Sequence, residues 1–279
     1  MANYTAADIK ALRERTGAGM LDVKKALDEA DGNAEKALEI IRVKGLKGVS
    51  KREGRAASDG LVAAHVADDA SGQTGVLIEL NSETDFVAKN ATFVELADKV
   101  LAAAVAAGTD DVAAVLASEI DGTSVQRTID ETAATLGEKL VLRRVARISA
   151  EKVAVYLHKV NKDLPPQVGV LVGTDSAAAA VAKDVAMHVA AFSPAYLTRE
   201  DVPSETVESE RRIAEETSRN EGKPEAALPK IIEGRLTGFF KESVLVDQAF
   251  AKDNKKTVGK VVEEAGGTLT AFARFRVGA

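Results

Sequence analysis

The sequence predicts an α+β protein made of a three-helix N-terminal module followed by two related α+β subdomains, with an αα-hairpin inserted in the second. Three observations predict this class. The first 45 residues contain short helical segments separated by turn residues. Residues 61–80 then alternate like a β-hairpin, and an amphipathic helix follows. The same order of strand, strand and helix recurs at residues 153–192, which indicates an internal repeat.

The N-terminal module begins with a capping box formed by Thr5 and Asp8, and Thr16-Gly17 ends its first helix. A second helix ends at Asp31-Gly32, and Asn33 caps a third. The connections between these three helices are short, so the helices must pack closely. The spacing is typical of the compact ubiquitin-associated type of module, a fold that usually binds other proteins through one exposed face.

A basic stretch follows the module and is taken as a domain boundary. It contains Lys44, Lys47, Lys51, Arg52 and Arg55, one acidic residue and three glycines. A binding site for an anionic partner is one interpretation, whereas a solvated linker or a continuation of the third helix is the more ordinary one. The resulting division is a module with its linker at 1–55, core subdomains at 56–150 and 151–279, and an inserted hairpin at 200–242. A length of 279 residues is sufficient for about two domains.

The first core subdomain opens with strands at 61–66 and 75–80, joined by a turn-rich segment. The next helix places seven apolar residues on one face, namely Phe93, Leu96, Ala97, Val100, Leu101, Ala104 and Val105. Residues 111–137 are expected to be helical, and 139–148 alternate like a half-buried strand.

The second core subdomain repeats this order with strands at 153–158 and 169–173 and a helix around Val185. When Gly75 is aligned with Gly169, and Val100 with Val185, the first copy has nine more residues between strand and helix. Those extra residues include Thr84 to Asn90. A short helix at 257–265 and a strand at 269–277 are expected to complete the subdomain.

The inserted hairpin combines a highly charged helix with an apolar one. The first helix begins at Ser204 and is broken at Gly222, and the second begins at Pro224. The apolar residues of the second helix are Leu228, Ile231, Ile232, Leu236, Phe239 and Phe240. They form a larger apolar face than the first helix can cover, so part of that face is expected to meet the body of the protein or another chain.

Composition excludes several classes of chemistry. The chain has no cysteine and three histidines, which rules out disulfides, thiolate metal sites and cysteine nucleophiles. Glycine-rich phosphate loops, HExxH and GxSxG are absent from the sequence, so we expect neither an enzyme nor a bound cofactor or metal. A net charge of −6 with few aromatic residues argues against direct nucleic-acid binding and favours protein partners.

No membrane segment is expected, because the longest purely apolar run, from Val100 to Ala107, is far shorter than the roughly 20 residues that a membrane-spanning helix needs. The start of the sequence has no signal-peptide pattern. We therefore expect a soluble, cytoplasmic protein. His188 and His65 are expected to be buried and hydrogen-bonded. His158 ends a strand just before a loop, so an exposed contact role stays open there beside the ordinary buried one.

The most informative segment runs from Glu83 to Asn90. Its ordinary interpretation is a strand-to-helix connection that is capped by Ser82 or Thr84 and has Phe86 tucked into the core. The alternative is a protruding loop in which Phe86 is an apolar anchor and Asp85 is its polar rim. The sister subdomain lacks these residues, which gives the second interpretation its weight.

Residues Thr84-Asp85-Phe86-Val87-Ala88-Lys89-Asn90 resemble the signature of the elongation factor Ts family, the nucleotide exchange factors of bacterial elongation factor Tu. Leu12 to Met20 resembles the second hallmark of the family. Family patterns are also matched, in order, by Arg143-Arg144, Ala186 to Ala191, Glu233-Gly234-Arg235 and Gln248-Ala249-Phe250. The resemblance covers essentially the whole chain.

The resemblance implies a mechanism and a set of contacts. Thr84, Asp85, Phe86 and Val87 would insert as a wedge between helices of the G domain of elongation factor Tu·GDP, displace the magnesium ion, release GDP and allow GTP to load. No catalytic residue is implied. Two other functions stay open, a scaffold without exchange activity and a nucleotide-handling enzyme, although the missing phosphate loop disfavours the enzyme.

Further contacts follow from the same resemblance. Arg13, Met20 and Leu21 would dock on the same G domain, although a core role for Leu21 is equally consistent with the pattern. His158 would touch another domain of the partner, but the segment from Lys159 to Pro166 replaces the glycine-rich turn that often follows this histidine. The hairpin at 200–242 resembles a dimerisation element, which would give a homodimer and a 2:2 complex.

Overall fold

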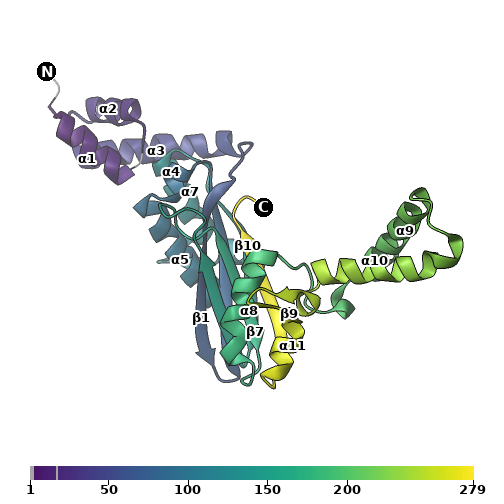
Figure 1. The fold of residues 1–279 in the computed structure, drawn as a ribbon. Coiled ribbons are helices and arrows are strands. Elements are labelled where there is room, and N and C mark those ends of the chain that lie inside the picture. The colour runs from purple at the N-terminus through teal and green to yellow at the C-terminus, as the bar shows by residue number, and fades with distance from the viewer. Residues whose placement is uncertain (1–2, 17) are drawn as a thin grey trace.

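A computed structural model describes residues 3–16 and 18–279 and shows an N-terminal helical module, two packed sheets and a projecting helical hairpin (Figure 1). The module consists of α1 (Ala6–Thr16), α2 (Met20–Glu29) and α3 (Ala34–Arg52). The predicted capping box is confirmed, because the Thr5 amide donates to Asp8 Oδ2 at 2.7 Å and the Asp8 amide to Thr5 Oγ1 at 3.3 Å. Gly17, the predicted end of the first helix, lies outside the described residues.

Helix α3 continues through the basic stretch to Arg52, so the linker interpretation is wrong for residues 44–52 and the continuing-helix interpretation is correct. Gly45 and Gly48 lie within this helix, and Gly45 makes its close packing possible. A Cβ atom at Gly45 would lie 2.0 Å from the carbonyl oxygen of Ala134 on α7 (Val125–Leu136). The missing side chain therefore lets α3 cross α7 in direct backbone contact.

The first sheet is antiparallel, in the order β1-β2-β5, with β1 (Asp59–Asp69), β2 (Gly72–Ser82) and β5 (Val141–Ala150). The β1–β2 turn is tighter than predicted, because Asp69 pairs directly with Gly72. Helices α5 (Ala91–Ala107), α6 (Val112–Ala117) and α7 cover one face around a core that includes Phe93 and Ile129. The prediction of continuous helix at 111–137 is wrong, because the short strands β3 (Glu119–Ile120) and β4 (Thr123–Ser124) separate α6 from α7. A positive φ at Asp121 and Gly122 forms the turn between them.

The second sheet is also antiparallel, in the order β10-β7-β6, with β6 (Lys152–His158), β7 (Val168–Thr174) and β10 (Leu269–Arg276). Its outer face carries α8 (Ala179–Phe192), α11 (Val258–Glu264) and the short strands β8 (Ala249–Phe250) and β9 (Asp253–Thr257). His188 is fully buried, as predicted. Its Nε2 lies 2.8 Å from Gln248 Oε1, and burial lowers its pKa. The prediction for His65 is wrong, because its side chain on edge strand β1 is exposed.

The two sheets pack face to face, and two glycines allow the close approach. A Cβ atom at Gly75 would meet Val153 at 2.7 Å and Leu171 at 3.2 Å, and a Cβ atom at Gly169 would meet Leu77 at 2.6 Å. Each glycine therefore receives the leucine that stands two residues after the other glycine. This reciprocal packing relates the same two glycines that align in the sequence repeat.

The inserted segment forms the helices α9 (Ser204–Asn220) and α10 (Leu228–Ser243), which project away from the sheets (Figure 1). Arg211 of α9 pairs with Glu233 of α10 at 2.6 Å, and Arg235 of α10 pairs with Glu221, the C-cap of α9, at 2.8 Å. Three 3-10 turns, Arg199–Asp201, Glu225–Ala227 and Leu245–Asp247, flank these helices. Among the described residues, no helix combines the length and apolarity needed to cross a membrane.

Candidate functional site

The connection from β2 to α5 contains a four-residue helix, α4 (Asp85–Ala88), that the second subdomain lacks. Eight residues, 83–90, join β2 to α5, whereas four residues, 175–178, join β7 to α8. The connection is therefore four residues longer and not nine as predicted, because the other five residues lie within β2 and α5. Thr84 is the N-cap of α4 and accepts a hydrogen bond from the Val87 amide at 3.4 Å. Asn90 caps α5 through the Thr92 amide at 2.9 Å. Two caps in close succession define the shape of this loop.

Adjacent side chains of α4 point in opposite directions. Phe86 is 73% exposed, whereas Val87 is 7% exposed and packs into the core of the first subdomain. The core interpretation of Phe86 is therefore wrong, and the protruding-anchor interpretation agrees with the structure. Lys89 Nζ lies 4.7 Å from the centre of the Phe86 ring and 3.9 Å from Asp85 Oδ2, so a cation flanks both exposed groups.

Glu138, which the sequence analysis did not single out, holds the start of this loop. Its Oε2 accepts hydrogen bonds from the amides of Glu83 at 3.1 Å and Thr84 at 3.0 Å, and its Oε1 accepts from Thr84 Oγ1 at 2.6 Å. In return, Glu83 Oε1 accepts from the Lys139 amide at 2.7 Å. Glu138 stands 54 residues from Thr84 in the sequence, so no local pattern could have connected them.

The N-terminal module and the α4 loop both line one hollow of about 520 Å³. It is lined by Lys10, Arg13, Glu14, Phe86, Val87, Asn90, Leu136 and Glu138. Arg13 and Phe86, which are 73 positions apart in the sequence, therefore border one surface. The close crossing of α3 over α7, together with an ion pair between Arg42 and Glu131, positions the module for this contact.

The other predicted contact residues are exposed at separate places. Met20 and Leu21 begin α2, and Leu21 is 72% exposed, so the alternative core role for Leu21 is wrong. His158 ends β6 on the second sheet and is exposed, with its Nδ1 3.1 Å from the Tyr156 hydroxyl. It does not line the hollow shared by Arg13 and Phe86.

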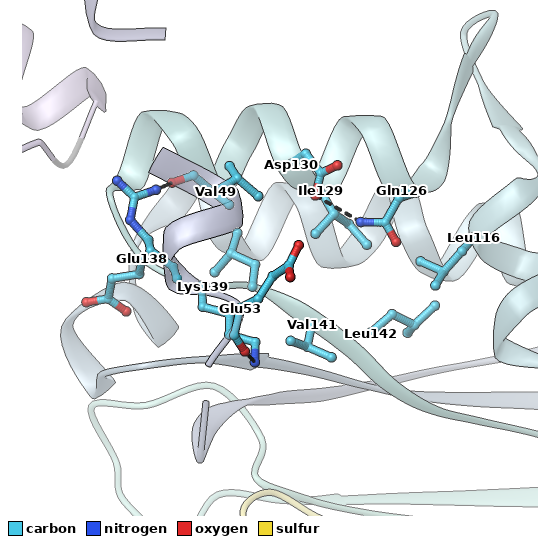
Figure 2. A pocket seen from close by; sticks show the side chains of 13 residues that line it. Val49, Glu53, Leu116, Gln126, Ile129, Asp130, Glu138, Lys139, Val141 and Leu142 are labelled. Atoms are coloured by element: carbon cyan, nitrogen blue, oxygen red, sulfur yellow. Dashed lines mark hydrogen bonds between the residues drawn. The ribbon is translucent and has the colours of Figure 1, made fainter. Parts of the chain in front are cut away.

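Figure 2 shows a second hollow, of about 410 Å³, between the end of α3, helix α7 and strand β5. Its apolar lining comprises Val49, Leu116, Ile129, Ala133, Leu140, Val141 and Leu142. At its rim, Lys139 Nζ donates to the backbone carbonyls of Glu53 and, at 3.0 Å, Arg55. The turn that carries Glu138 is thus tied to the end of α3 as well as to the α4 loop.

An exposed phenyl ring on a loop held from behind, beside a module with exposed apolar side chains of its own, defines a protein that acts by binding another protein. The family model described as elongation factor Ts matches residues 83–279. The full-length sequence is 73% identical to the elongation factor Ts of Beutenbergia cavernae, 65% to that of Kocuria rhizophila and 59% to that of Streptomyces coelicolor, each covering all of both chains. The chain belongs to the elongation factor Ts family. Members of this family are nucleotide exchange factors for elongation factor Tu in protein biosynthesis, and not enzymes.

Proposed function

We propose that this protein binds elongation factor Tu·GDP in the cytoplasm and releases GDP by inserting the α4 loop into the G domain of its partner. The observation that carries the proposal is the exposed Phe86, presented on a turn whose next residue, Val87, is buried. An apolar ring held away from its own core is suited to fill a pocket on another protein. Asp85, beside it, supplies a polar contact at the rim, and Thr84 caps the turn.

The expected mechanism is allosteric competition between the factor and GDP. This protein is expected to bind the nucleotide-free form of the partner more tightly than the GDP-bound form. It must then lower the partner's affinity for GDP by the same ratio by which GDP lowers the partner's affinity for this protein. Mg²⁺ requires nearly ideal octahedral geometry, so a small displacement of its ligands is enough to weaken the hold on GDP. Displacement of the magnesium ion by the wedge then lets GTP load.

Release of a fluorescent GDP analogue from elongation factor Tu tests the proposal. Adding this protein is expected to accelerate release in proportion to its concentration until the partner is saturated. Binding of the two proteins without acceleration would instead support a scaffold and contradict the exchange function. Omitting Mg²⁺ from the buffer is expected to raise the rate of GDP release without this protein. The acceleration that this protein adds is then expected to be smaller, because the omission and the wedge both remove the same ion.

The N-terminal module supplies a second contact in this proposal. Arg13, Met20 and Leu21 are exposed on the module, and Arg13 borders the same hollow as Phe86. Two linked contacts bind more tightly than either alone, because the second forms within one complex. His158, exposed at the end of β6, is proposed to contact a different domain of the partner.

Arg13→Ala is expected to weaken association about ten-fold without lowering the maximal exchange rate, because removing one charged contact typically costs about 1 to 2 kcal/mol. Exchange rates measured over a range of factor concentrations separate the two quantities. Arg15, which is already paired with Glu35 at 3.0 Å, provides the matched control variant Arg15→Ala. A maximal rate reduced as far as in Phe86→Ala would contradict this division of roles.

We also propose that the α9–α10 hairpin joins two copies of the chain and gives a 2:2 complex with the partner. Ile213 on α9 is 51% exposed, and it borders a hollow of about 320 Å³ between the two helices, together with Leu236 and Phe239. An apolar strip along the side of a projecting hairpin can meet the same strip of a second copy across a two-fold axis.

Ile213→Glu is expected to convert a dimer into a monomer, because it would place two carboxylates in the contact. Sedimentation velocity over a range of protein concentrations measures this change, with Glu216→Ala on the exposed side of α9 as the control. The wild-type chain sedimenting as a monomer at every concentration would refute the dimer. That result would leave the exchange function untouched, because the wedge lies in the other subdomain.

A further inference from the structure

We propose that Glu138 is a positioning residue for nucleotide exchange, one that sets the direction in which Phe86 points. The inference rests on the proposed wedge function and extends it to a residue that acts through the loop. Glu138 is half-buried behind the loop and engages Glu83 and Thr84, the two residues that precede α4. Phe86 follows two residues later.

Both oxygens of the Glu138 carboxylate are used. Oε2 accepts the amides of Glu83 and Thr84, and Oε1 accepts the Thr84 hydroxyl at 2.6 Å. The reverse bond, from the Lys139 amide to Glu83 Oε1 at 2.7 Å, closes a reciprocal pair between the two turns. Four hydrogen bonds therefore fix two loops to each other, and three of them end on one side chain. Hydrogen bonds to a carboxylate are stronger than those between neutral groups.

Helix α4 needs such support because it has only four residues. An isolated turn of this length is not stable in water, because the conformational entropy lost in nucleating a helix outweighs the hydrogen bonds of a single turn. Phe86 adds no internal packing, because its ring is exposed, so Val87 and Ala88 are the buried residues of this turn. These two residues hold the C-terminal half of α4 against the core, and the hydrogen bonds from Glu138 hold the backbone of Thr84 at its N-terminal end.

The clamp also places the wedge relative to the N-terminal module. Glu138 follows Gly137, the C-cap of α7, which has a φ of +80°. Helix α7 is also the element on which α3 rests, through Gly45 and Ala134. Helix α7 therefore fixes the positions of both the N-terminal module and the loop that carries Phe86. Preorganisation of this kind reduces the entropy lost when both contacts form on the partner.

The test compares maximal exchange rate with half-saturating concentration for three variants. Glu138→Ala removes all three bonds and is expected to lower the maximal rate about ten-fold, since misplacement of a functional group by about 1 Å costs up to 100-fold. The half-saturating concentration is expected to change less, because Arg13, Met20 and Leu21 still dock. Glu138→Gln is expected to restore most of the rate, because its amide oxygen can accept both backbone amides while its NH₂ donates to the Thr84 hydroxyl.

Glu138→Asp keeps the charge but is one methylene shorter, so it is expected to behave like Glu138→Ala, which a purely electrostatic role would not predict. The matched control is Glu119→Ala, which removes an exposed carboxylate elsewhere in the same subdomain. Amide hydrogen exchange gives a second readout. The amides of Glu83 and Thr84 are expected to exchange about ten-fold faster or more in Glu138→Ala, because their acceptor is gone. Unchanged protection of these amides would contradict the clamp.

A double variant decides whether Glu138 acts through the wedge. In a Phe86→Ala background, Glu138→Ala is expected to have little further effect on the maximal rate, because there is no ring left to position. If the two substitutions instead reduce the maximal rate by the product of their separate effects, Glu138 has an independent role and the proposal is overturned.

A full exchange rate in Glu138→Ala, with a slow rate in Phe86→Ala, would overturn the positioning role alone. A normal rate in Phe86→Ala would instead overturn the wedge itself. If Glu138→Ala does not fold, Glu138→Asp and its double variant with Phe86→Ala carry the same comparisons.

Discussion

Replacing Phe86 with alanine is expected to slow catalysed GDP release by roughly 30-fold or more while leaving the thermal unfolding midpoint unchanged. An apolar anchor of a protein interface is typically worth about 2 to 4 kcal/mol, and every 1.4 kcal/mol is a factor of ten. The ring is 73% exposed, so its removal takes almost nothing from the folded core. Stopped-flow release of a fluorescent GDP analogue and calorimetric unfolding measure the two quantities.

Two other phenylalanines provide controls for this experiment. Phe192 is an exposed ring on α8, in the other sheet layer, and Phe192→Ala is expected to leave exchange unchanged. Phe93 on α5 is fully buried, and Phe93→Ala is expected to lower the free energy of unfolding by about 3 to 5 kcal/mol. A Phe86→Ala variant that unfolds like Phe93→Ala would show that the ring serves the core. A Phe86→Ala variant with an undiminished exchange rate would refute the anchor.

Arg144→Ala is expected to lower the free energy of unfolding by about 3 kcal/mol, because it would leave a buried carboxylate without its partner. Glu79 on β2 is fully buried, and Arg144 Nε donates to its Oε2 at 2.7 Å. The same guanidinium donates to the Arg276 carbonyl at 3.0 Å and lies 4.6 Å from the centre of the Phe275 ring. Arg144 thereby joins the first sheet to β10 of the second. Urea unfolding measures the loss.

The neighbouring Arg143 is the matched control. Its side chain is exposed, and Arg143→Ala is expected to change stability by no more than about 0.5 kcal/mol. Replacing both members of the pair, as in Glu79→Met with Arg144→Met, is expected to cost less than Arg144→Ala alone, because no unpaired charge stays buried. Equal losses for Arg143→Ala and Arg144→Ala would contradict the buried ion pair.

The predictions that succeeded depend on local patterns. The capping box at Thr5, the amphipathic face around Phe93 and the hairpin interruption at Gly222 each follow from residues a few positions apart. The repeat of strand, strand and helix also predicted that the α4 loop is an addition to one copy. The sequence therefore drew attention to Phe86 before its exposure was visible.

The predictions that failed depend on what packs against a segment. The pattern indicates that Gly45 interrupts a basic stretch, yet Gly45 lies inside α3. It is a glycine there because the backbone of Ala134 occupies the space that a side chain would need. His65 reads as part of an apolar strand, yet it is exposed on edge strand β1. Leu21 could be a core or a surface residue by pattern alone. In each case a distant element decides the environment of the residue.

The sequence by itself determined the class of fold, the family and the loop that carries Phe86, because capping, periodicity and short motifs are properties of neighbouring residues. Only the tertiary structure decided that Phe86 is exposed while Val87 is buried, that Arg13 borders the same hollow, and that Glu138 clamps the loop. The physical reason is separation along the chain. Hydrogen bonds and packing between residues more than 50 positions apart, such as Glu138 and Thr84, exist only once the sheet and helices have brought them together.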